Sequence, residues 1–211
     1  MKQFPPTVKG TIWAVYSIME SSEALLHLLD KKELYHAYLQ SVTSESRKRE
    51  WLAVRVLLKN MLQEEKEILY HTNGKPYLAD YSYHISISHT KGYAAIALNK
   101  VHPVGIDIEY LSSRAGKSYS RFMSSEEYLQ VSPENMETQL LLHWSAKESL
   151  FKILGEAHVD FKSCLHISPF QLVLGNLSSF PAHETKTEAN HAYTVHYLAN
   201  EAYVLTLAEE I

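Results

Sequence analysis

The hexapeptide VGIDIE at residues 104–109 says more about the fold than any other stretch of the sequence. In an extended chain, successive side chains point to opposite faces. Ile106 and Ile108 therefore share one face, and Asp107 and Glu109 share the other. The apolar pair predicts a strand packed against a core. The acidic pair predicts two carboxylates that project together.

Two neighbouring carboxylates repel each other, which makes it costly to ionise both. A bound cation removes this cost, and carboxylate oxygens favour Mg²⁺ or Ca²⁺ over zinc. The alternative is a solvent-facing edge on which Asp107 and Glu109 are two exposed acids. The hexapeptide taken alone favours this simpler interpretation.

A helix predicted at 133–154 carries a second motif that bears on the acidic pair. Ser132 stands at its cap, Pro133 at its first position and Gly155 just past its end, which are the preferred residues at these places. The helix carries WSAKESLFK at 144–152.

Within this motif, Trp144, Glu148 and Lys152 are four residues apart and so line one helix face. The simpler interpretation is a surface pair of Glu148 and Lys152. The alternative is a third carboxylate for the metal, with a lysine beside it for phosphate charge. Glu148 could then act as a general base, and Lys152 could neutralise a leaving phosphate.

A helix face with positive charge is predicted earlier in the sequence than the acidic motifs. In the helix expected at 44–65, capped by Thr43 or Ser44, Arg47 and Arg55 lie on one face with Trp51 between them. This face suits a polyanion, although ordinary helix solvation explains single arginines as well.

The remaining segments alternate between strand patterns and helical periodicity. We expect strands at 11–18, 83–88, 93–98 and 165–174, a helix at 22–40, a hairpin turn at Asn73-Gly74, a capping box of Ser124 and Glu127, a polar loop at 176–190 and a closing hairpin at 193–208.

The strand–turn–strand units at 84–98 and 193–207 hint at an internal duplication. Their identity is too low to prove it, and two unrelated hairpins would look alike. A duplication would divide the chain into 1–103 and 104–211.

Composition narrows the function classes. The chain has 211 residues, of which 45% are hydrophobic and 21% charged, and its formal net charge is −4. These values are typical of a globular protein and argue against binding nucleic acid through bulk positive charge. The single cysteine, Cys164, cannot form an intramolecular disulfide, and the scattered histidines argue against zinc. Without a signal-peptide core or a membrane-length apolar run, we expect a soluble, cytoplasmic protein.

Five motifs stand in one order along the chain: GKP at 74–76, ISISHTKGYAAIAL at 85–98, VGIDIE at 104–109, RFMSSEEY at 121–128 and WSAKESLFK at 144–152. In order and spacing they resemble the 4′-phosphopantetheinyl transferase superfamily, and more closely its long, pseudo-dimeric branch that activates peptide synthetases such as surfactin synthetase. GIDIE together with WxxKExxxK is specific, whereas either alone is weak.

This resemblance implies an α+β fold of two similar α/β subdomains, each an antiparallel sheet on helices, related by a pseudo-twofold axis with CoA between them. It implies a Mg²⁺-dependent holo-carrier-protein synthase that moves the 4′-phosphopantetheine arm from CoA to a serine of an apo acyl or peptidyl carrier protein. Adenosine 3′,5′-bisphosphate would be released. The expected state is a monomer that binds neither nucleic acid nor membrane.

By matching positions, the resemblance implies that Asp107, Glu109 and Glu148 hold Mg²⁺. Glu148 would also be the base for the incoming serine. Lys152 would contact the phosphate and assist the leaving group.

The resemblance also implies a set of residues around the nucleotide and its phosphates: Lys75, Ser88, His89, Lys152 and, near the adenine and 3′-phosphate, Arg55. Upstream, Arg47 aligns with one of two basic residues of the family, and Lys48 or Arg49 could take this role instead. Two other functions stay open: a non-catalytic CoA-binding regulator and a Mg²⁺-dependent phosphohydrolase.

Overall fold

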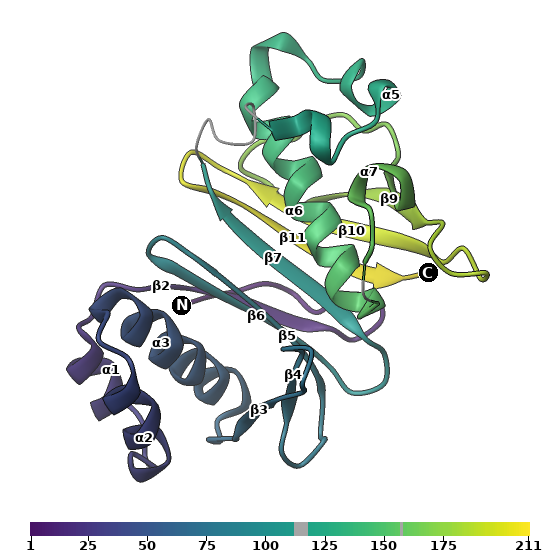
Figure 1. Cartoon of the computed structure of the whole chain (residues 1–211). Helices are drawn as coiled ribbons and strands as arrows, with labels where there is room; N and C mark the ends of the chain where they lie inside the picture. Colours follow the sequence, from purple (N-terminus) through teal and green to yellow (C-terminus); the bar gives the residue numbers. More distant parts are fainter. Residues whose placement is uncertain (112–117, 157) are drawn as a thin grey trace. The chain divides into compact units, whose positions relative to one another are not determined.

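The computed structural model describes residues 1–111, 118–156 and 158–211, and its contacts divide the chain into two compact units, Met1–Val101 and His102–Ile211. Each unit is an antiparallel sheet packed against helices (Figure 1), so the predicted α+β class is confirmed. None of the helices in the described ranges has both the length and the apolar character needed to cross a membrane.

In the described part of the N-terminal unit, four antiparallel strands have the order β1-β2-β6-β5. These strands are β1 (Lys2–Gln3), β2 (Ile12–Ser17), β5 (His84–Thr90) and β6 (Tyr93–Asn99). A separate hairpin pairs β3 (Ile68–Tyr70) with β4 (Pro76–Leu78). The helices are α1 (Ser22–His27), α2 (Glu33–Ser41) and α3 (Glu45–Leu62).

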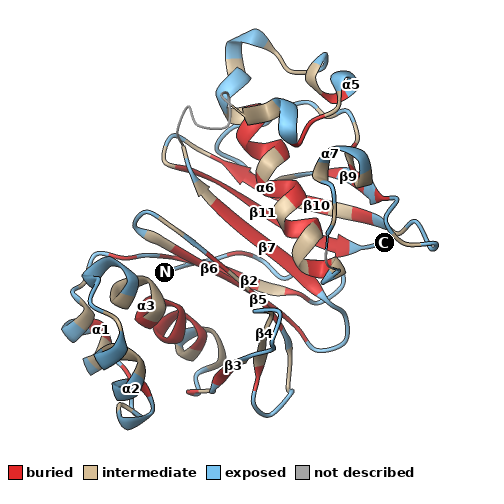
Figure 2. Cartoon of the chain, in the orientation of Figure 1, coloured by how far each residue is buried: buried red, intermediate tan, exposed pale blue. Residues whose placement is uncertain are grey.

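Helix α3 covers the sheet by packing on β2 and β6, and α1 packs on α3. The Ser44 side chain accepts the amide proton of Arg47 and so caps α3, as one of the two predicted cap residues. Residues 52–58 of α3 are all buried (Figure 2), and most of them join the apolar core of this unit. Arg55 is the charged residue in this buried run.

The single helix predicted at 22–40 is wrong, because the structure has α1 and α2 with a break between them. At this break, the Glu65 carboxylate accepts the backbone amides of Asp30 and Lys31. A carboxylate distant in sequence therefore takes amides that a continuous helix would use internally.

In the described part of the C-terminal unit, five antiparallel strands have the order β7-β11-β10-β9-β8. These strands are β7 (Val104–Tyr110), β8 (Leu165–Ile167), β9 (Ser178–Glu184), β10 (Ala192–Ala199) and β11 (Tyr203–Glu210). The helices are the 3₁₀ turns η1 (Tyr119–Arg121) and η2 (Pro133–Asn135), and α5 (Ser125–Tyr128), α6 (Met136–Leu154) and α7 (Phe161–Cys164).

Helix α6 lies across β7 and β11, and Figure 2 shows buried stretches along it that alternate with half-buried ones. The capping box of Ser124 and Glu127 is confirmed, and Gly155 ends α6 in the left-handed region, at φ 63°. The helix predicted at 133–154 begins as the 3₁₀ turn η2 and becomes α-helical at Met136.

Two predictions near the C-terminus are wrong. The strand expected at 165–174 ends at Ile167, and β9 lies inside the expected polar loop at 176–190. Burial alternates along β9, but one of its buried positions is the carboxylate Glu184. This carboxylate accepts backbone amides from the following turn, which is why a polar residue can be buried there.

Candidate functional site

Helix α6 approaches the sheet of its unit unusually closely, because small residues line the contact. Gly105 of β7 faces the backbone of Ser149, and a Cβ atom at position 105 would lie 1.9 Å from the Ser149 carbonyl oxygen. The hydroxyls of Ser145 and Ser149 lie 2.9 and 2.8 Å from the Thr206 hydroxyl of β11. This packing sets the distance between acidic side chains on β7 and α6.

The acidic side chains of β7 meet two residues of the WSAKESLFK motif. The Lys152 ammonium donates to Asp107 Oδ1 at 2.9 Å and to the Ile106 carbonyl oxygen at 2.8 Å. The Trp144 indole N–H donates to Glu109 Oε1 at 2.8 Å. The helix face predicted from the four-residue spacing therefore does face the acidic edge of β7.

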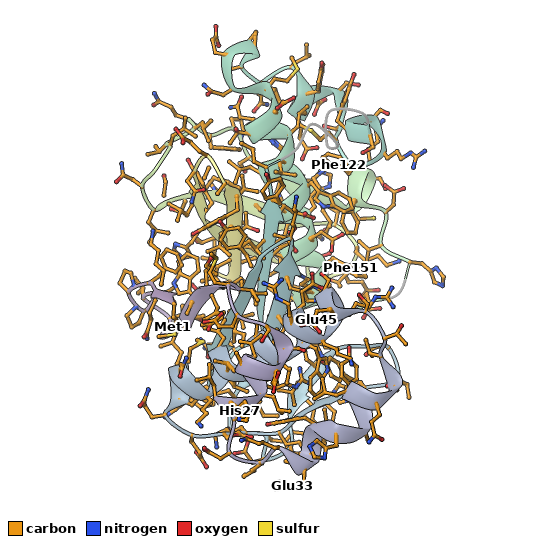
Figure 3. All side chains as sticks on the ribbon, turned by 90° about the vertical axis from the view of Figure 1, so that its left-hand side faces the viewer. Met1, His27, Glu33, Glu45, Phe122 and Phe151 are labelled. Atoms are coloured by element: carbon orange, nitrogen blue, oxygen red, sulfur yellow. The ribbon has the colours of Figure 1, made fainter. Side chains whose placement is uncertain are left out.

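Trp144 is held in a row of aromatic rings whose ends, Phe122 and Phe151, are labelled in Figure 3. Its ring centroid lies 5.2 Å from that of Phe122 and 5.6 Å from that of Phe161. Ring pairs at such separations pack favourably, so the indole that donates to Glu109 has a fixed position.

The third carboxylate, Glu148, is half-buried, and its pKa is raised from the ordinary value of 4.5 to about 7. Burial is the largest cause, and the negative charge of Asp107 adds to it, followed by that of Glu109. The positive charge of Lys152 opposes the shift. The charges of Asp107 and Glu109 therefore act on Glu148. The single positive charge of Lys152 does not balance the three carboxylates.

Across residues 1–111, 118–156 and 158–211, no three His, Cys, Asp or Glu side chains are grouped as a ready-made metal site. Instead, an ammonium contacts the most buried member of the trio, since Asp107 is 5% exposed and pairs with Lys152. The structure thus brings the predicted residues into one region and shows a lysine as the cation there.

The N-terminal unit contains a cavity of about 410 Å³, within the size range of small-molecule sites. Three residues predicted to bind the nucleotide, Arg47, Arg55 and His89, line it. The full set of lining residues is Tyr38, Arg47, Glu50, Trp51, Val54, Arg55, Tyr70, Gly74, Pro76, Ile87 and His89.

Arg55 is 4% exposed, and its guanidinium carbon lies 3.3 Å from the centre of the Trp51 ring. One of its N–H groups donates to the Trp51 carbonyl oxygen at 3.0 Å. Burial lowers the pKa of Arg55, while the nearby Tyr70 hydroxyl opposes this shift. The arginine is thus fixed in the wall of the cavity.

The structure distinguishes between two of the upstream basic residues. Arg49 donates to the carbonyl oxygens of Glu20 at 2.8 Å and Ile18 at 2.9 Å, which ties α3 to the end of β2. Arg47 is exposed and lines the cavity. Arg47 is therefore better placed than Arg49 to contact a ligand.

Two other predicted nucleotide contacts, Lys75 and Ser88, are not among the residues that line the cavity. Lys75 follows the lining residue Gly74, and burial lowers the pKa of its ammonium. Ser88 is buried on β5, next to His89. His89 Nδ1 lies 3.4 Å from Glu50 Oε2, and both residues line the cavity.

A family model described as "4′-phosphopantetheinyl transferase superfamily" matches residues 103–208, which is half of the chain. The chain belongs to the 4′-phosphopantetheinyl transferase superfamily. The residues that the family model matches include β7 and α6, the two elements that carry the acidic trio.

Curated members of this superfamily are similar over part of their length. The 4′-phosphopantetheinyl transferase gsp of Aneurinibacillus migulanus is 31% identical over 134 residues, which are 59% of this chain and 56% of the relative. The transferase psf-1 of Bacillus pumilus is 31% identical over 119 residues, 51% of each chain. AcpT of Salmonella typhi is 29% identical over 133 residues, 60% of this chain and 69% of the relative. The chain thus spans about half the length of gsp and psf-1, and these two relatives confirm the predicted branch.

Sequence reasoning gave no role to Lys147, the lysine before Glu148. Its side chain is fully buried, and its ammonium donates to Glu127 at 2.8 Å and to the carbonyl oxygens of Phe122 and Phe161 at 2.7 and 3.0 Å. Glu127 was predicted only as a capping residue. A charged residue inside an apolar helix pattern was the available signal, because buried charges in proteins are paired.

Proposed function

We propose that the protein moves the 4′-phosphopantetheine arm of CoA to a serine hydroxyl of an apo acyl or peptidyl carrier protein. The observation that carries this proposal is the acidic trio of Asp107, Glu109 and Glu148, drawn together by β7 and α6 beside Lys152. The relatives that carry the name 4′-phosphopantetheinyl transferase support the same activity.

The donor set of the trio fits Mg²⁺. Its carboxylate oxygens are hard ligands. The pKa of Glu148 is raised mainly by burial and also by the negative charge of Asp107 and Glu109, which a divalent cation would relieve. We propose that Asp107, Glu109 and Glu148 hold the ion. When bound, the ion would neutralise charge on the pyrophosphate of CoA. Lys152 would then exchange Asp107 for a phosphate of the substrate.

The transfer needs little covalent chemistry from the protein. The serine oxygen bonds to the phosphorus that carries the pantetheine arm, and the bond from this phosphorus to the bridging oxygen breaks. Adenosine 3′,5′-bisphosphate leaves with the bonding electron pair. Glu148 accepts the serine proton, and Lys152 stabilises the negative charge on the leaving phosphate.

The cavity of the N-terminal unit would bind the nucleotide of CoA. Arg47, Arg55 and His89 supply positive charge or N–H donors to its wall, which suits a ligand with a 3′-phosphate and a pyrophosphate. Lys75 and Ser88 are sequence neighbours of lining residues, and we propose that they add contacts to the phosphates.

Each unit has one long helix on an antiparallel sheet: α3 on β2 and β6, and α6 on β7 and β11. This supports the proposal that the subdomains 1–103 and 104–211 are similar halves, as in a pseudo-dimeric transferase. One chain would then be sufficient for activity, and we expect a monomer in analytical ultracentrifugation.

The direct test incubates the full chain with CoA, Mg²⁺ and several apo carrier proteins, and reads their intact masses. We expect one phosphopantetheine arm to be added, and the Asp107→Asn variant to add none. If no carrier gains mass, the transferase proposal fails.

Two parallel measurements distinguish the alternatives. Hydrolysis of CoA without an acceptor protein would indicate a phosphohydrolase. Tight CoA binding without turnover on any carrier would indicate a regulator.

A further inference from the structure

Arg55 belongs to a stack of flat side chains at the cavity wall. The Trp51 ring lies 3.3 Å from the Arg55 guanidinium carbon and stacks on Tyr38, with ring centroids 4.1 Å apart and an interplanar angle of 13°. All three residues line the cavity. A guanidinium on an aromatic face is attracted by the ring's electrons, most strongly at tryptophan.

The stack is anchored by Tyr35, which is buried and is not among the residues that line the cavity. The edge of Tyr35 meets the Trp51 ring at a centroid distance of 5.5 Å, and the Tyr35 hydroxyl donates to Glu65 at 2.5 Å. Glu65 in turn accepts the backbone amides of Asp30 and Lys31. The Trp51 ring therefore rests on a buried and hydrogen-bonded network.

A free arginine side chain would lose much rotational freedom on binding a ligand. Here Arg55 is already fixed by the ring of Trp51, by the Trp51 carbonyl oxygen and by the neighbouring Tyr70. A guanidinium carries five N–H groups, and the Trp51 carbonyl oxygen and the Tyr70 hydroxyl use only some of them, so the group can also donate to an anion in the cavity.

We propose that Trp51 and Tyr38 are positioning residues, which hold the Arg55 guanidinium in advance for the 3′-phosphate of CoA. This inference rests on the proposed function, because the ligand it names is the nucleotide of CoA. It assigns a binding role to two aromatic residues that sequence reasoning treated only as part of a helix face or left aside.

The test compares two nucleotides that differ by one phosphate, adenosine 3′,5′-bisphosphate and adenosine 5′-monophosphate. Their affinities for the full chain are measured by titration calorimetry. We expect Trp51→Leu to weaken binding of the bisphosphate about tenfold and binding of the monophosphate much less. In the Arg55→Gln background, the same Trp51 change should have less than about a twofold effect, because its action passes through Arg55.

Three further variants separate positioning from structure. Tyr38→Leu, at a half-buried position, should lower the preference for the bisphosphate even where Trp51→Leu folds poorly. Trp51→Phe should restore part of the preference, since it keeps an aromatic face. Tyr81→Leu removes an exposed ring that does not line the cavity and should leave the preference unchanged.

The inference is overturned if the Trp51 and Tyr38 variants weaken both nucleotides equally, or if the Trp51 effect is the same with and without Arg55. Failure of the proposed function looks different, because the wild-type chain would then transfer no arm to any carrier. A wild-type chain that transfers the arm, with Trp51→Leu and Tyr38→Leu variants that keep the full preference, refutes the positioning role alone.

Discussion

Gly105 of β7 and Ser149 of α6 touch through their backbones, since a Cβ at position 105 would lie 1.9 Å from the Ser149 carbonyl oxygen. We expect Gly105→Ala to lower the free energy of unfolding by about 3 kcal/mol, because α6 must shift to make room. The same shift would separate Glu148 from Asp107 and lower the transfer rate. Urea unfolding and the carrier-protein assay measure the two effects.

Ser149→Ala is the matched comparison for this prediction. It removes hydroxyl contacts to Thr206 but keeps the close approach, so it should cost about 1 kcal/mol. Equal costs for Gly105→Ala and Ser149→Ala would contradict the role assigned to the close approach.

The raised pKa of Glu148 predicts that the free energy of unfolding of the metal-free chain depends on pH. Between its ordinary pKa of 4.5 and about 7, the folded chain keeps a proton that the unfolded chain loses, so stability falls as pH rises through this window. Glu148→Gln should therefore stabilise the chain at pH 8 by about 1–3 kcal/mol and have little effect at pH 4. Urea unfolding in the presence of a chelator at both pH values measures the difference.

Glu137→Gln is the control, because it changes an exposed glutamate on the same helix. It should shift stability little at either pH. A Glu148→Gln effect that does not depend on pH would contradict the raised pKa that burial and the charges of Asp107 and Glu109 give this carboxyl.

We expect the Trp144 indole to increase the affinity for Mg²⁺, because its N–H donates to Glu109 Oε1 and so orients this carboxylate. Trp144→Phe keeps a ring between Phe122 and Phe161 but loses this donor. Partners that orient metal ligands typically contribute ten- to a hundredfold in affinity, so we expect Mg²⁺ affinity to fall about tenfold. Titration of the Mg²⁺ dependence of transfer measures this, and an unchanged midpoint would refute the positioning of Glu109.

Local patterns predicted the elements that carry the acidic trio. The alternation in β7 and the caps of α6 act over a few residues, so spacing placed Asp107 and Glu109 on one strand face and Glu148 and Lys152 on one helix face. The family resemblance was needed to predict that these two faces meet. The closeness of these surfaces was not predictable, because it depends on Gly105 meeting a helix more than 40 residues further along the chain.

Contacts between distant segments account for what the sequence did not predict. The break between α1 and α2 needs the carboxylate of Glu65, more than 30 residues away. The roles of Arg49 and Lys147 depend on carbonyl oxygens from other elements, which no residue type reveals. A basic residue looks the same in sequence whether it binds a ligand or the protein's own backbone.

Replacing the two lysines of the WSAKESLFK motif should have different main effects, on stability for Lys147 and on transfer for Lys152. Lys147→Met leaves the buried Glu127 without its cation and should cost about 3 kcal/mol of stability. Lys152 is 26% exposed but pairs with the buried Asp107, so Lys152→Met should cost about 2 kcal/mol, less than Lys147→Met, and should in addition abolish most transfer. Unfolding curves and transfer rates of both variants check this, and Glu127→Gln added to Lys147→Met should restore part of the lost stability. A Lys147 variant that is stable but inactive would reverse the assignment.

Arg47 and Arg49 offer the same contrast on α3. Arg47 is exposed at the cavity, so Arg47→Ala should raise the KM for CoA about tenfold and leave thermal stability nearly unchanged. Arg49 gives its guanidinium to the carbonyl oxygens of Ile18 and Glu20, so Arg49→Ala should lower stability by about 2 kcal/mol with little change in KM. Steady-state kinetics and thermal unfolding of both variants measure the contrast. If Arg49→Ala instead raised KM while Arg47→Ala only destabilised, the nucleotide would contact a different part of the helix from the one that lines the cavity.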